Sequence, residues 1–491
     1  MFHVKDKRNL TMLTDFYELT MANGYLVKEI QDKQVVFDMF FRKIPDGGGY
    51  AIFAGLEQLI QYLNNLSFSA EDIHFLKSKN IFSQEFLEYL ATFKFECDIW
   101  AVKEGTPIFP YEPLIVVKGP AVQAQLIETM LLLTVNFQSL IATKSARMNH
   151  VAEGRAIMEF GSRRAQGYDA AIFGARAAYI GGCTSTACVI ADQCFKIPAV
   201  GTMAHSWVQL FNSEYEAFKA YAEIYPENCT LLIDTYDALR SGMPNAIKVF
   251  DEVLKPKNFR PKGVRIDSGD IAYLSKHIRQ MLDEAGYSDC KIVASNSLDE
   301  YIIRELIVQE AKVDLFGVGE NLITSRSEPV FGGVYKLAAV EENGSLAPRI
   351  KISESPEKVT TPGSKNLYRL YDKKSGKASA DYITLQDETI DDTKPLTIFD
   401  PNAIWNRKTL KEFKAVGLLN QIYDKGNLVY DLPSLEEIQS YCKEEMKLLW
   451  DELKRLENPQ RYYVDLSDKL WMLKNDLLNN AYTNYQPINS D

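Results

Sequence analysis

The sequence predicts an α/β protein built around an irregular, incomplete β/α barrel. Short apolar runs end at Phe160, Val200, Ile233, Ile266, Ala294 and Phe316. Amphipathic helical segments follow most of these runs, over residues 214–224, 246–254, 271–285 and 300–311. Strand-plus-helix units of roughly 30 residues are typical of parallel strands joined by right-handed crossovers. Six such runs favour a barrel over an open sheet.

The segments before and after these strand-plus-helix units have less regular patterns. Before it, the patterns predict strands over 35–41, 99–102 and 114–117, helices over 56–63 and 84–93, and a long helical stretch over 121–150. After it, residues 341–380 are polar and predict a loop-rich region. From Leu410 onward we expect charged helical stretches to dominate, for example over 434–456.

Composition excludes several classes of protein. With 491 residues and a formal net charge of −11, the chain lacks the broad positive field that nucleic acids and anionic membranes attract. The most apolar segment, 126–140, carries polar residues and is too short to span a bilayer. The first ten residues do not resemble a signal peptide, and the seven cysteines form no CxxC pair. We therefore expect a soluble cytoplasmic protein without a zinc site.

Polar and Gly-rich residues stand directly after the predicted strands. In a barrel these loops open on one face, where active sites of such folds lie. The alternative is that they are ordinary polar turns. The runs are Phe160–Arg164, Gly201–Ser206, Asp234–Asp237, Arg265–Asp270, Ser295–Ser297 and Phe316–Glu320.

Two of these runs suit an aromatic acid and a phosphorylated sugar. In Phe160–Arg164, a phenyl ring can stack a flat ring while a guanidinium grips its carboxylate, unless the arginines are a simple surface pair. In Arg265–Asp270, Asp267 and Asp270 can bind ribose hydroxyls or Mg²⁺, and Arg265 can neutralise a phosphate. A helix N-cap would explain one of the residues in the second run, but not all of them.

A glycine loop and a histidine complete the candidate site. Gly317 and Gly319 would let backbone N–H groups approach a phosphate, although a GxG sequence alone is common. His205, one of five histidines, can carry a proton or act as a nucleophile, and a structural histidine is the alternative.

Taken jointly, these runs resemble those of the nicotinate phosphoribosyltransferases, which are type II phosphoribosyltransferases. The N-terminal run Thr14–Ala22 also resembles the opening motif of that family, and the order and spacing fit over roughly residues 9–400. The resemblance implies an α/β sandwich domain from residues 1–135, a barrel with the active site from 136–340, and a return to the sandwich with a helical C-terminal extension over 341–491. It also implies a homodimer with shared active sites.

The resemblance further implies a role for each site residue. Phe160 and Tyr17, the latter from a second subunit, would enclose the pyridine ring, and Arg163 would face its carboxylate. Other contacts to substrate would come from Asp15, Arg265, Asp267, Ser268, Gly269, Gly317, Gly319 and Thr324. His205 would be phosphorylated by ATP, and Mg²⁺ would enter with the substrate diphosphate, held by Asp267 or Asp270.

The implied reaction joins nicotinate to 5-phosphoribosyl-1-diphosphate with ATP hydrolysis in NAD salvage, which is transferase chemistry with a ligase-type classification. Nicotinamide or quinolinate as the base are the near alternatives. A barrel aldolase or isomerase would need a Schiff-base lysine or a carboxylate base, and no loop named above contains a lysine. A non-catalytic ligand-binding barrel is the distant alternative.

Overall fold

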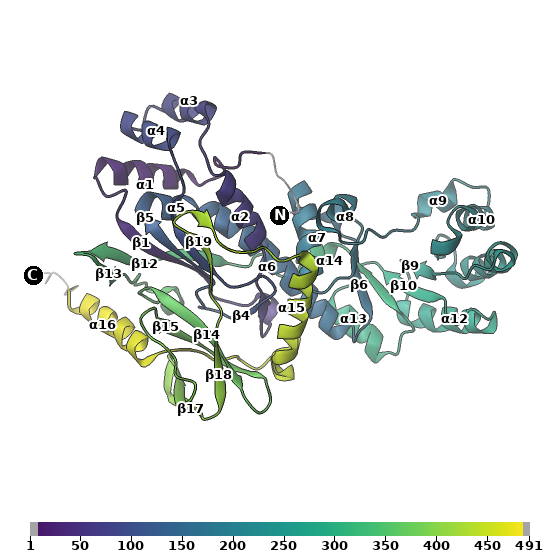
Figure 1. Ribbon diagram of the computed structural model, residues 1–491. Helices are drawn as coiled ribbons and strands as arrows, with labels where there is room; N and C mark the ends of the chain where they lie inside the picture. The colour runs from purple at the N-terminus through teal and green to yellow at the C-terminus, as the bar shows by residue number, and fades with distance from the viewer. Residues whose placement is uncertain (1–7, 485–491) are drawn as a thin grey trace, which may run out of the picture. The chain divides into compact units, whose positions relative to one another are not determined.

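The computed structural model describes residues 8–484, which form two compact units. The first holds the described residues up to Leu140 and from Val330 onward, and the second holds Ile141–Pro329. In Figure 1 the second unit carries the elements from α7, in blue, to α14, in green-teal. The chain passes from one unit to the other within the long helix α6 (Glu128–Val151) and again near Val330.

The main sheet of the first unit is antiparallel and has seven strands. Alternating or continuous burial along its central strands explains why these apolar segments become strands. Their order is β13 (Ser345–Pro348), β12 (Gly333–Glu342), β1 (Gln34–Phe41), β5 (Ile115–Pro120), β3 (Asp98–Ala101), β19 (Asn420–Asp424) and β20 (Asn427–Leu428).

Helices supply the other half of this unit's core. Helix α2 (Leu56–Asn65), α5 (Ala121–Leu126) and the first turns of α6 contribute buried aliphatic side chains to the same cluster as the sheet. A second cluster joins α1 (Phe16–Val27), α3 (Ala70–Ser78) and α4 (Gln84–Ala91). The continuous stretch Ala121–Val151 is long and apolar enough to cross a membrane, but 61% of its most apolar window is buried inside the protein. We interpret it as a core helix.

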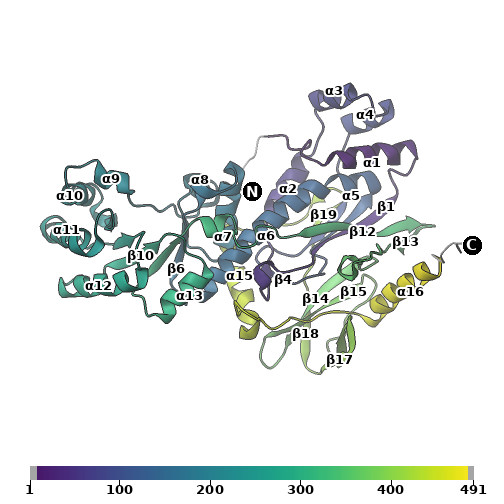
Figure 2. The same ribbon diagram turned by 180° about the vertical axis from the view of Figure 1, so that it is seen from behind.

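The C-terminal part of this unit differs from two expectations. The loop-rich region predicted over 341–380 contains β14 (Lys365–Asp372) and the start of β15 (Ala378–Leu385), and β18 (Phe413–Gly417) follows Leu410. These strands form a second sheet with β21 (Val464–Leu466), and β16 (Leu396–Asp400) pairs with β17 (Ala403–Leu410) in a hairpin. Figure 2 shows β14, β15 and β18 with β17 close to them. The charged helices are present as α15 (Leu435–Leu448) and α16 (Asp468–Asn484).

The second unit contains a six-stranded, fully parallel sheet. Its order is β7 (Ser185–Thr186), β6 (Ala156–Glu159), β11 (Leu315–Val318), β10 (Lys291–Ser295), β9 (Gly263–Ile266) and β8 (Thr230–Leu232). Within the described residues this sheet ends at β7 and β8 without closing, which confirms the incomplete barrel.

Helices connect these strands. They include α7 (Tyr168–Ile180), α8 (Val189–Phe195), α9 (His205–Gln209), α10 (Glu214–Ile224), α11 (Met243–Val249), α12 (Ile271–Glu284), α13 (Glu300–Val308) and α14 (Glu320–Ile323). The four helices predicted over 214–224, 246–254, 271–285 and 300–311 correspond to α10, to α11 and the turns after it, to α12 and to α13. The strand predicted to end at Val200 is wrong. Only an isolated bridge between Ala199 and Thr186 forms there, because the apolar run is too short to add a strand beyond β7.

Candidate active site

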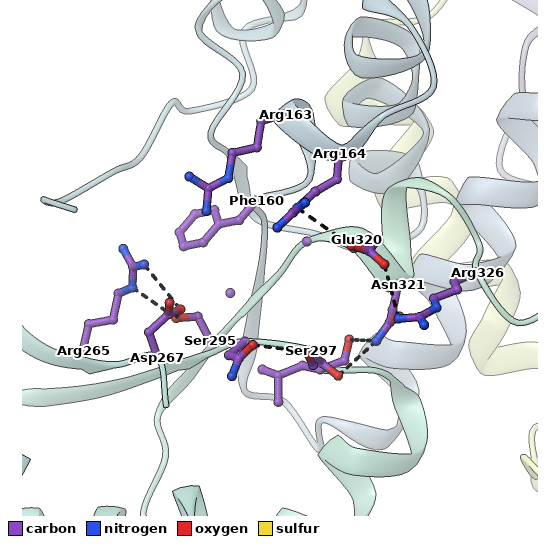
Figure 3. A pocket seen from close by; sticks show the side chains of 14 residues that line it. Phe160, Arg163, Arg164, Arg265, Asp267, Ser295, Ser297, Glu320, Asn321 and Arg326 are labelled. Carbon is purple, nitrogen blue, oxygen red and sulfur yellow. Dashed lines mark hydrogen bonds and ion pairs between the residues drawn. The ribbon is translucent and has the colours of Figure 1, made fainter. Parts of the chain in front are cut away.

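Loops from the carboxyl ends of β6, β9, β10 and β11 surround a cavity of about 250 Å³ in the second unit (Figure 3). This placement follows from the parallel sheet, since the carboxyl ends of parallel strands share one edge. The cavity is lined by Phe160, Arg163, Arg164, Arg265, Asp267, Ser295, Asn296, Ser297, Leu298, Gly317, Gly319, Glu320, Asn321 and Arg326.

A second cavity of about 550 Å³ lies next to the first and shares four of its residues. The shared residues are Phe160, Arg163, Arg265 and Asp267. The second cavity adds the Gly201–Ser206 loop, including His205. The two hollows are therefore neighbouring parts of one site, with a phenyl ring, two guanidiniums and a carboxylate between them.

Phe160 is held in place by backbone and side-chain hydrogen bonds. Its N–H donates to the carbonyl of Val318 on the neighbouring strand, at 2.7 Å. The Glu159 side chain, which is fully buried, accepts from the N–H of Gly161 and from the hydroxyl of Thr186. Burial raises the pKa of Glu159. This carboxyl therefore fixes the turn that presents Phe160 on one side and Arg163 on the other.

Gly317 makes room for the phenyl ring. A methyl group placed on Gly317 would lie 2.6 Å from Cδ2 of Phe160 and 2.7 Å from Cε2. Ordinary contacts between carbon atoms are about 3.5–4.0 Å. A side chain at position 317 would consequently push the ring away, so the glycine is required by the close approach of Phe160 to β11.

Arg265, Asp267 and Ser295 form a polar cluster beside the ring. The guanidinium of Arg265 donates from Nε to the Ser295 hydroxyl at 3.1 Å and lies 3.5 Å from Oδ1 of Asp267. Its Cζ lies 6.0 Å from the centroid of the Phe160 ring, within range of a cation–π interaction. The Ser295 hydroxyl donates to the Asp267 carboxylate. The Arg265 guanidinium is thus held at the cavity wall by Ser295 of the neighbouring strand β10 and by Asp267, which directly follows its own strand β9.

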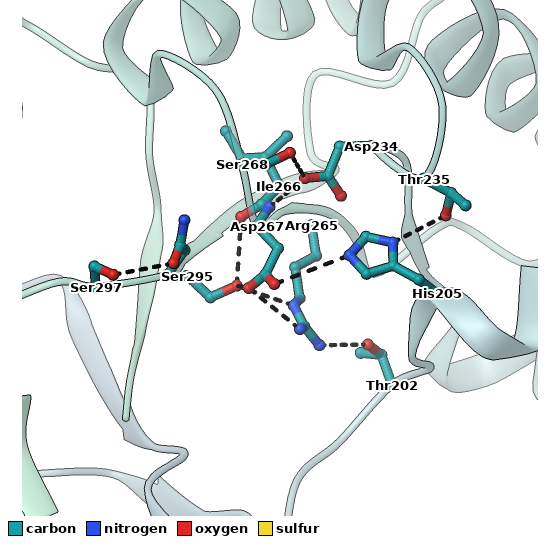
Figure 4. Close-up of polar contacts among 11 residues, drawn as sticks. Thr202, His205, Asp234, Thr235, Arg265, Ile266, Asp267, Ser268, Ser295 and Ser297 are labelled. Atoms are coloured by element: carbon teal, nitrogen blue, oxygen red, sulfur yellow. Dashed lines mark hydrogen bonds and ion pairs between the residues drawn. The ribbon is translucent and has the colours of Figure 1, made fainter. Parts of the chain in front are cut away.

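Asp234, from the loop after β8, organises the Asp267 loop (Figure 4). Its Oδ2 accepts from the N–H of Asp267 at 2.8 Å and from the hydroxyl of Ser268 at 2.6 Å. Its Oδ1 is buried and has no hydrogen-bond partner among the described residues. Sequence reasoning grouped Asp234 with the polar loops but gave it no role, because its partners lie more than 30 residues away.

His205 lies at the start of α9 and faces two polar groups (Figure 4). Its Nδ1 is 3.1 Å from the hydroxyl of Thr235, and its Nε2 is 4.0 Å from Oδ2 of Asp267. The imidazole is 40% exposed and lines the second cavity, so a ligand there can reach it. Together, Thr235 and Asp267 orient an imidazole that stays accessible.

Several residues singled out from the sequence serve local structure. Asp270 caps α12 by accepting the N–H of Tyr273 at 2.9 Å. The Thr324 hydroxyl donates to the carbonyl of Glu320 at 2.8 Å. Ser268, Gly269, Asp270 and Thr324 are not among the residues that line either cavity.

Asp15 and Tyr17 belong to the first unit, at the start of α1. The Asp15 N–H donates to the Thr129 hydroxyl at 3.0 Å, and that hydroxyl donates to the buried Glu18 carboxyl at 2.7 Å. Tyr17 is 47% exposed, and partial burial raises its pKa to about 12. The start of α1 is therefore held by its hydrogen bond to Thr129, while the Tyr17 side chain stays partly exposed.

The Asp267 carboxylate is of the type that holds a magnesium ion together with a phosphorylated ligand. No group of three or more His, Cys, Asp or Glu side chains suited to a metal occurs within residues 8–484. Mg²⁺ usually binds one or two carboxylates together with substrate phosphates and water. Asp267 lines both cavities and supplies one such carboxylate, whereas Asp234 lines neither cavity and its unpartnered Oδ1 is buried.

Comparisons with known families cover nearly the whole chain. Residues 12–136 match the nicotinate phosphoribosyltransferase N-terminal domain. Residues 155–378 match the nicotinate phosphoribosyltransferase family, and residues 364–474 match the nicotinate phosphoribosyltransferase C-terminal domain.

Individual relatives agree with these matches. The nicotinate phosphoribosyltransferase of Bacillus subtilis is 47% identical, over 95% of this chain and 94% of its own length. That of Dictyostelium discoideum is 34% identical, over 97% and 89%. Among solved structures, human nicotinic acid phosphoribosyltransferase is similar with a TM-score of 0.84 and 30% identity, covering 94% of this chain and 99% of that one.

Proposed function

Because the chain belongs to the nicotinate phosphoribosyltransferase family, we propose that it joins nicotinate to 5-phosphoribosyl-1-diphosphate in NAD salvage. The products are nicotinate mononucleotide and diphosphate, and ATP is hydrolysed to ADP and phosphate. The observation that carries the proposal is the cavity in which an aromatic ring, three further arginines beside Arg163, and a glycine loop meet. An aromatic carboxylate and a sugar phosphate are complementary to that lining.

Phe160 and Arg163 are the proposed nicotinate site. A phenyl ring stacks a flat pyridine, and a guanidinium recognises a carboxylate through two parallel hydrogen bonds. Arg163 is exposed beside the cavity, so its guanidinium is available to a ligand. From a second subunit, Tyr17 would cover the other face of the pyridine, with Asp15 beside it.

Arg265, Asp267 and the glycine loop are the proposed phosphoribosyl site. Arg265 would neutralise the diphosphate, and Asp267 would hold ribose hydroxyls or the Mg²⁺ that accompanies the diphosphate. Backbone N–H groups around Gly317 and Gly319 would approach the 5′-phosphate, since neither residue has a side chain in the way. Ser268, Gly269 and Thr324 are proposed to support this site through the loops they belong to.

The chemistry follows from placement and charge. The pyridine nitrogen attacks C1 of the ribose, and diphosphate leaves. Nicotinate nitrogen carries a free electron pair at neutral pH, so no strong base is required at the ring. Bound Mg²⁺ would neutralise charge that develops on the leaving group. The residues align nitrogen and C1 and offset the diphosphate charge, and alignment of this kind can lower a barrier by about 7–11 kcal/mol.

We propose that His205 accepts the γ-phosphoryl group of ATP on a ring nitrogen and that the phosphohistidine is hydrolysed during the cycle. In the first step the N–P bond forms, the bond to the β-phosphate oxygen breaks, and ADP leaves. In the second step water takes the phosphoryl group and His205 is restored. Support comes from the exposure of the imidazole and from its position beside Asp267, which lines both cavities.

A homodimer with shared active sites and a cytoplasmic location complete the proposal. The exposed Phe16 and Tyr17 at the start of α1, at 51% and 47%, support a role for this segment in contacting another subunit. Sedimentation of the purified protein tests the dimer. Complementation between a Tyr17→Ala chain and an Arg163→Ala chain would restore some activity only if the sites are shared.

The test of the activity is a diphosphate-release assay with 5-phosphoribosyl-1-diphosphate and Mg²⁺, with and without ATP. Nicotinate, nicotinamide and quinolinate are supplied separately. We expect nicotinate to be preferred and ATP to stimulate turnover. The Arg163→Ala variant should lose preference for the acid over the amide. Equal turnover of nicotinamide and nicotinate by the unaltered protein would contradict the assignment of the base.

A further inference from the structure

Glu320 lies between two arginines at the cavity (Figure 3). Its Oε1 accepts from Nη1 of Arg326 at 3.2 Å, and its Oε2 lies 3.8 Å from Nε of Arg164. The two guanidiniums come from different loops, one after β6 and one after α14. A single carboxylate therefore connects the two loops across the glycine turn at Gly319.

The cavity lining contains four arginines and two carboxylates. Asp267 is engaged by Arg265 and Ser295, as described above. Of the three remaining arginines, Glu320 pairs with two, Arg164 and Arg326. It follows Gly319 directly, so this ion-pair cluster stands at the end of the loop proposed to hold the 5′-phosphate.

We propose that Glu320 is an internal substitute for a substrate phosphate, and this inference rests on the proposed function. Before a phosphorylated ligand binds, its carboxylate holds Arg164 and Arg326 near their working positions. A phosphate group of 5-phosphoribosyl-1-diphosphate then displaces the carboxylate and takes over both guanidiniums. Glu320 thereby sets the affinity of the site for phosphorylated ligands.

The exchange is physically reasonable because carboxylate and phosphate oxygens accept the same guanidinium hydrogen bonds. All three side chains are accessible, with 60% exposure for Arg164, 69% for Arg326 and 43% for Glu320. Exposed ion pairs are weak, so breaking them costs little. A phosphate carries more negative charge than a carboxylate and offers more acceptor oxygens, so it wins the competition. Glu320 left nearby then repels the bound phosphate.

The test is the affinity of the full-length protein for inorganic phosphate and for 5-phosphoribosyl-1-diphosphate, measured by calorimetry at low salt. Glu320→Gln removes the competing charge and should lower both dissociation constants by about twofold to fivefold, the range of an exposed ion pair. Glu320→Ala should act in the same direction. Arg164→Gln and Arg326→Gln should each weaken binding. The gain in Glu320→Gln should shrink at high salt, because screening weakens exposed charges.

The matched control is Glu227→Gln, which removes the same charge from an exposed position in the second unit that lines neither cavity. It should leave both dissociation constants unchanged. Weaker or unchanged phosphate binding in Glu320→Gln would overturn the inference, as would failure of the unaltered protein to bind phosphate. Tighter phosphate binding in Glu320→Gln without turnover of any pyridine would instead leave this inference standing and reject the proposed function.

Discussion

Replacing Gly317 by alanine tests whether Phe160 sets the position of nicotinate. The added methyl group would lie 2.6 Å from Cδ2 of Phe160, against about 3.5–4.0 Å for an ordinary contact. The ring must therefore withdraw by about 1 Å. A displacement of about 1 Å at a reacting group can cost a factor of about 100 in rate. Overpacking of a buried site also costs about 1–3 kcal/mol of stability.

We expect Gly317→Ala to lower kcat/KM for nicotinate by about 10-fold to 100-fold. The assay is diphosphate release with nicotinate and 5-phosphoribosyl-1-diphosphate varied in turn. The control is Gly24→Ala in α1, where an added methyl group meets no atom within 4 Å. A variant that folds, retains the KM for nicotinate and loses affinity only for 5-phosphoribosyl-1-diphosphate would refute the reasoning. In that case the glycine would serve the phosphate and not the ring.

Three further predictions concern buried carboxyl groups. In Glu159→Gln a single amide oxygen replaces the two carboxylate oxygens that accept from the Gly161 N–H and the Thr186 hydroxyl. The KM for nicotinate should therefore rise about 5-fold to 10-fold, with the circular dichroism spectrum unchanged. An unchanged KM would show that Glu159 does not position Phe160. Burial raises the pKa of Glu18 from 4.5 to about 7, so its contribution to stability is complete below pH 4.5 and is lost as pH rises through 7. Thermal unfolding should therefore show a decline from pH 5 to pH 8, on the order of 2 kcal/mol, that is absent from Glu18→Gln; identical pH profiles would contradict this. Lys365→Met leaves the buried Asp38 carboxylate without its partner at 2.5 Å and should lower the free energy of unfolding in urea by about 3–5 kcal/mol. Lys374→Met, at an exposed ion pair with Glu412, should lower it by less than about 1 kcal/mol. Equal losses in the two variants would show that burial does not set the cost of breaking the pair.

Local periodicity was sufficient for several elements of the barrel. The helix predicted over 214–224 is α10 with the same bounds, and the predicted strands ending at Ile266 and Ala294 are β9 and β10. Such segments are specified by their own pattern, since an amphipathic helix and a buried parallel strand each have a recognisable period. Sequence alone also placed polar residues after each strand, and Phe160, Arg163, Arg265, Asp267, Gly317 and Gly319 line the first cavity.

Elsewhere, the sequence patterns did not predict strands whose partners lie far away in the chain. Strand β19 pairs with β3, more than 300 residues earlier in the chain, and β14 pairs with β15 and β18 within a stretch that is polar on one side. A strand of this kind forms because a partner edge is available, which no local period records. The apolar run ending at Val200 failed for the converse reason, since it has a single bridge and no continuous ladder.

The sequence by itself determined the fold class and the chemical types gathered at the strand ends. Only the tertiary structure decided which groups touch. The Glu159 carboxyl accepts from Thr186, 27 residues away, and Glu320 joins Arg164 to Arg326. These contacts depend on the packing of neighbouring strands and on the course of loops between them. The sequence therefore shows which residues carry charge or donate hydrogen bonds. The partner of each is set by the tertiary structure, because the ends of parallel strands meet at one edge of the sheet.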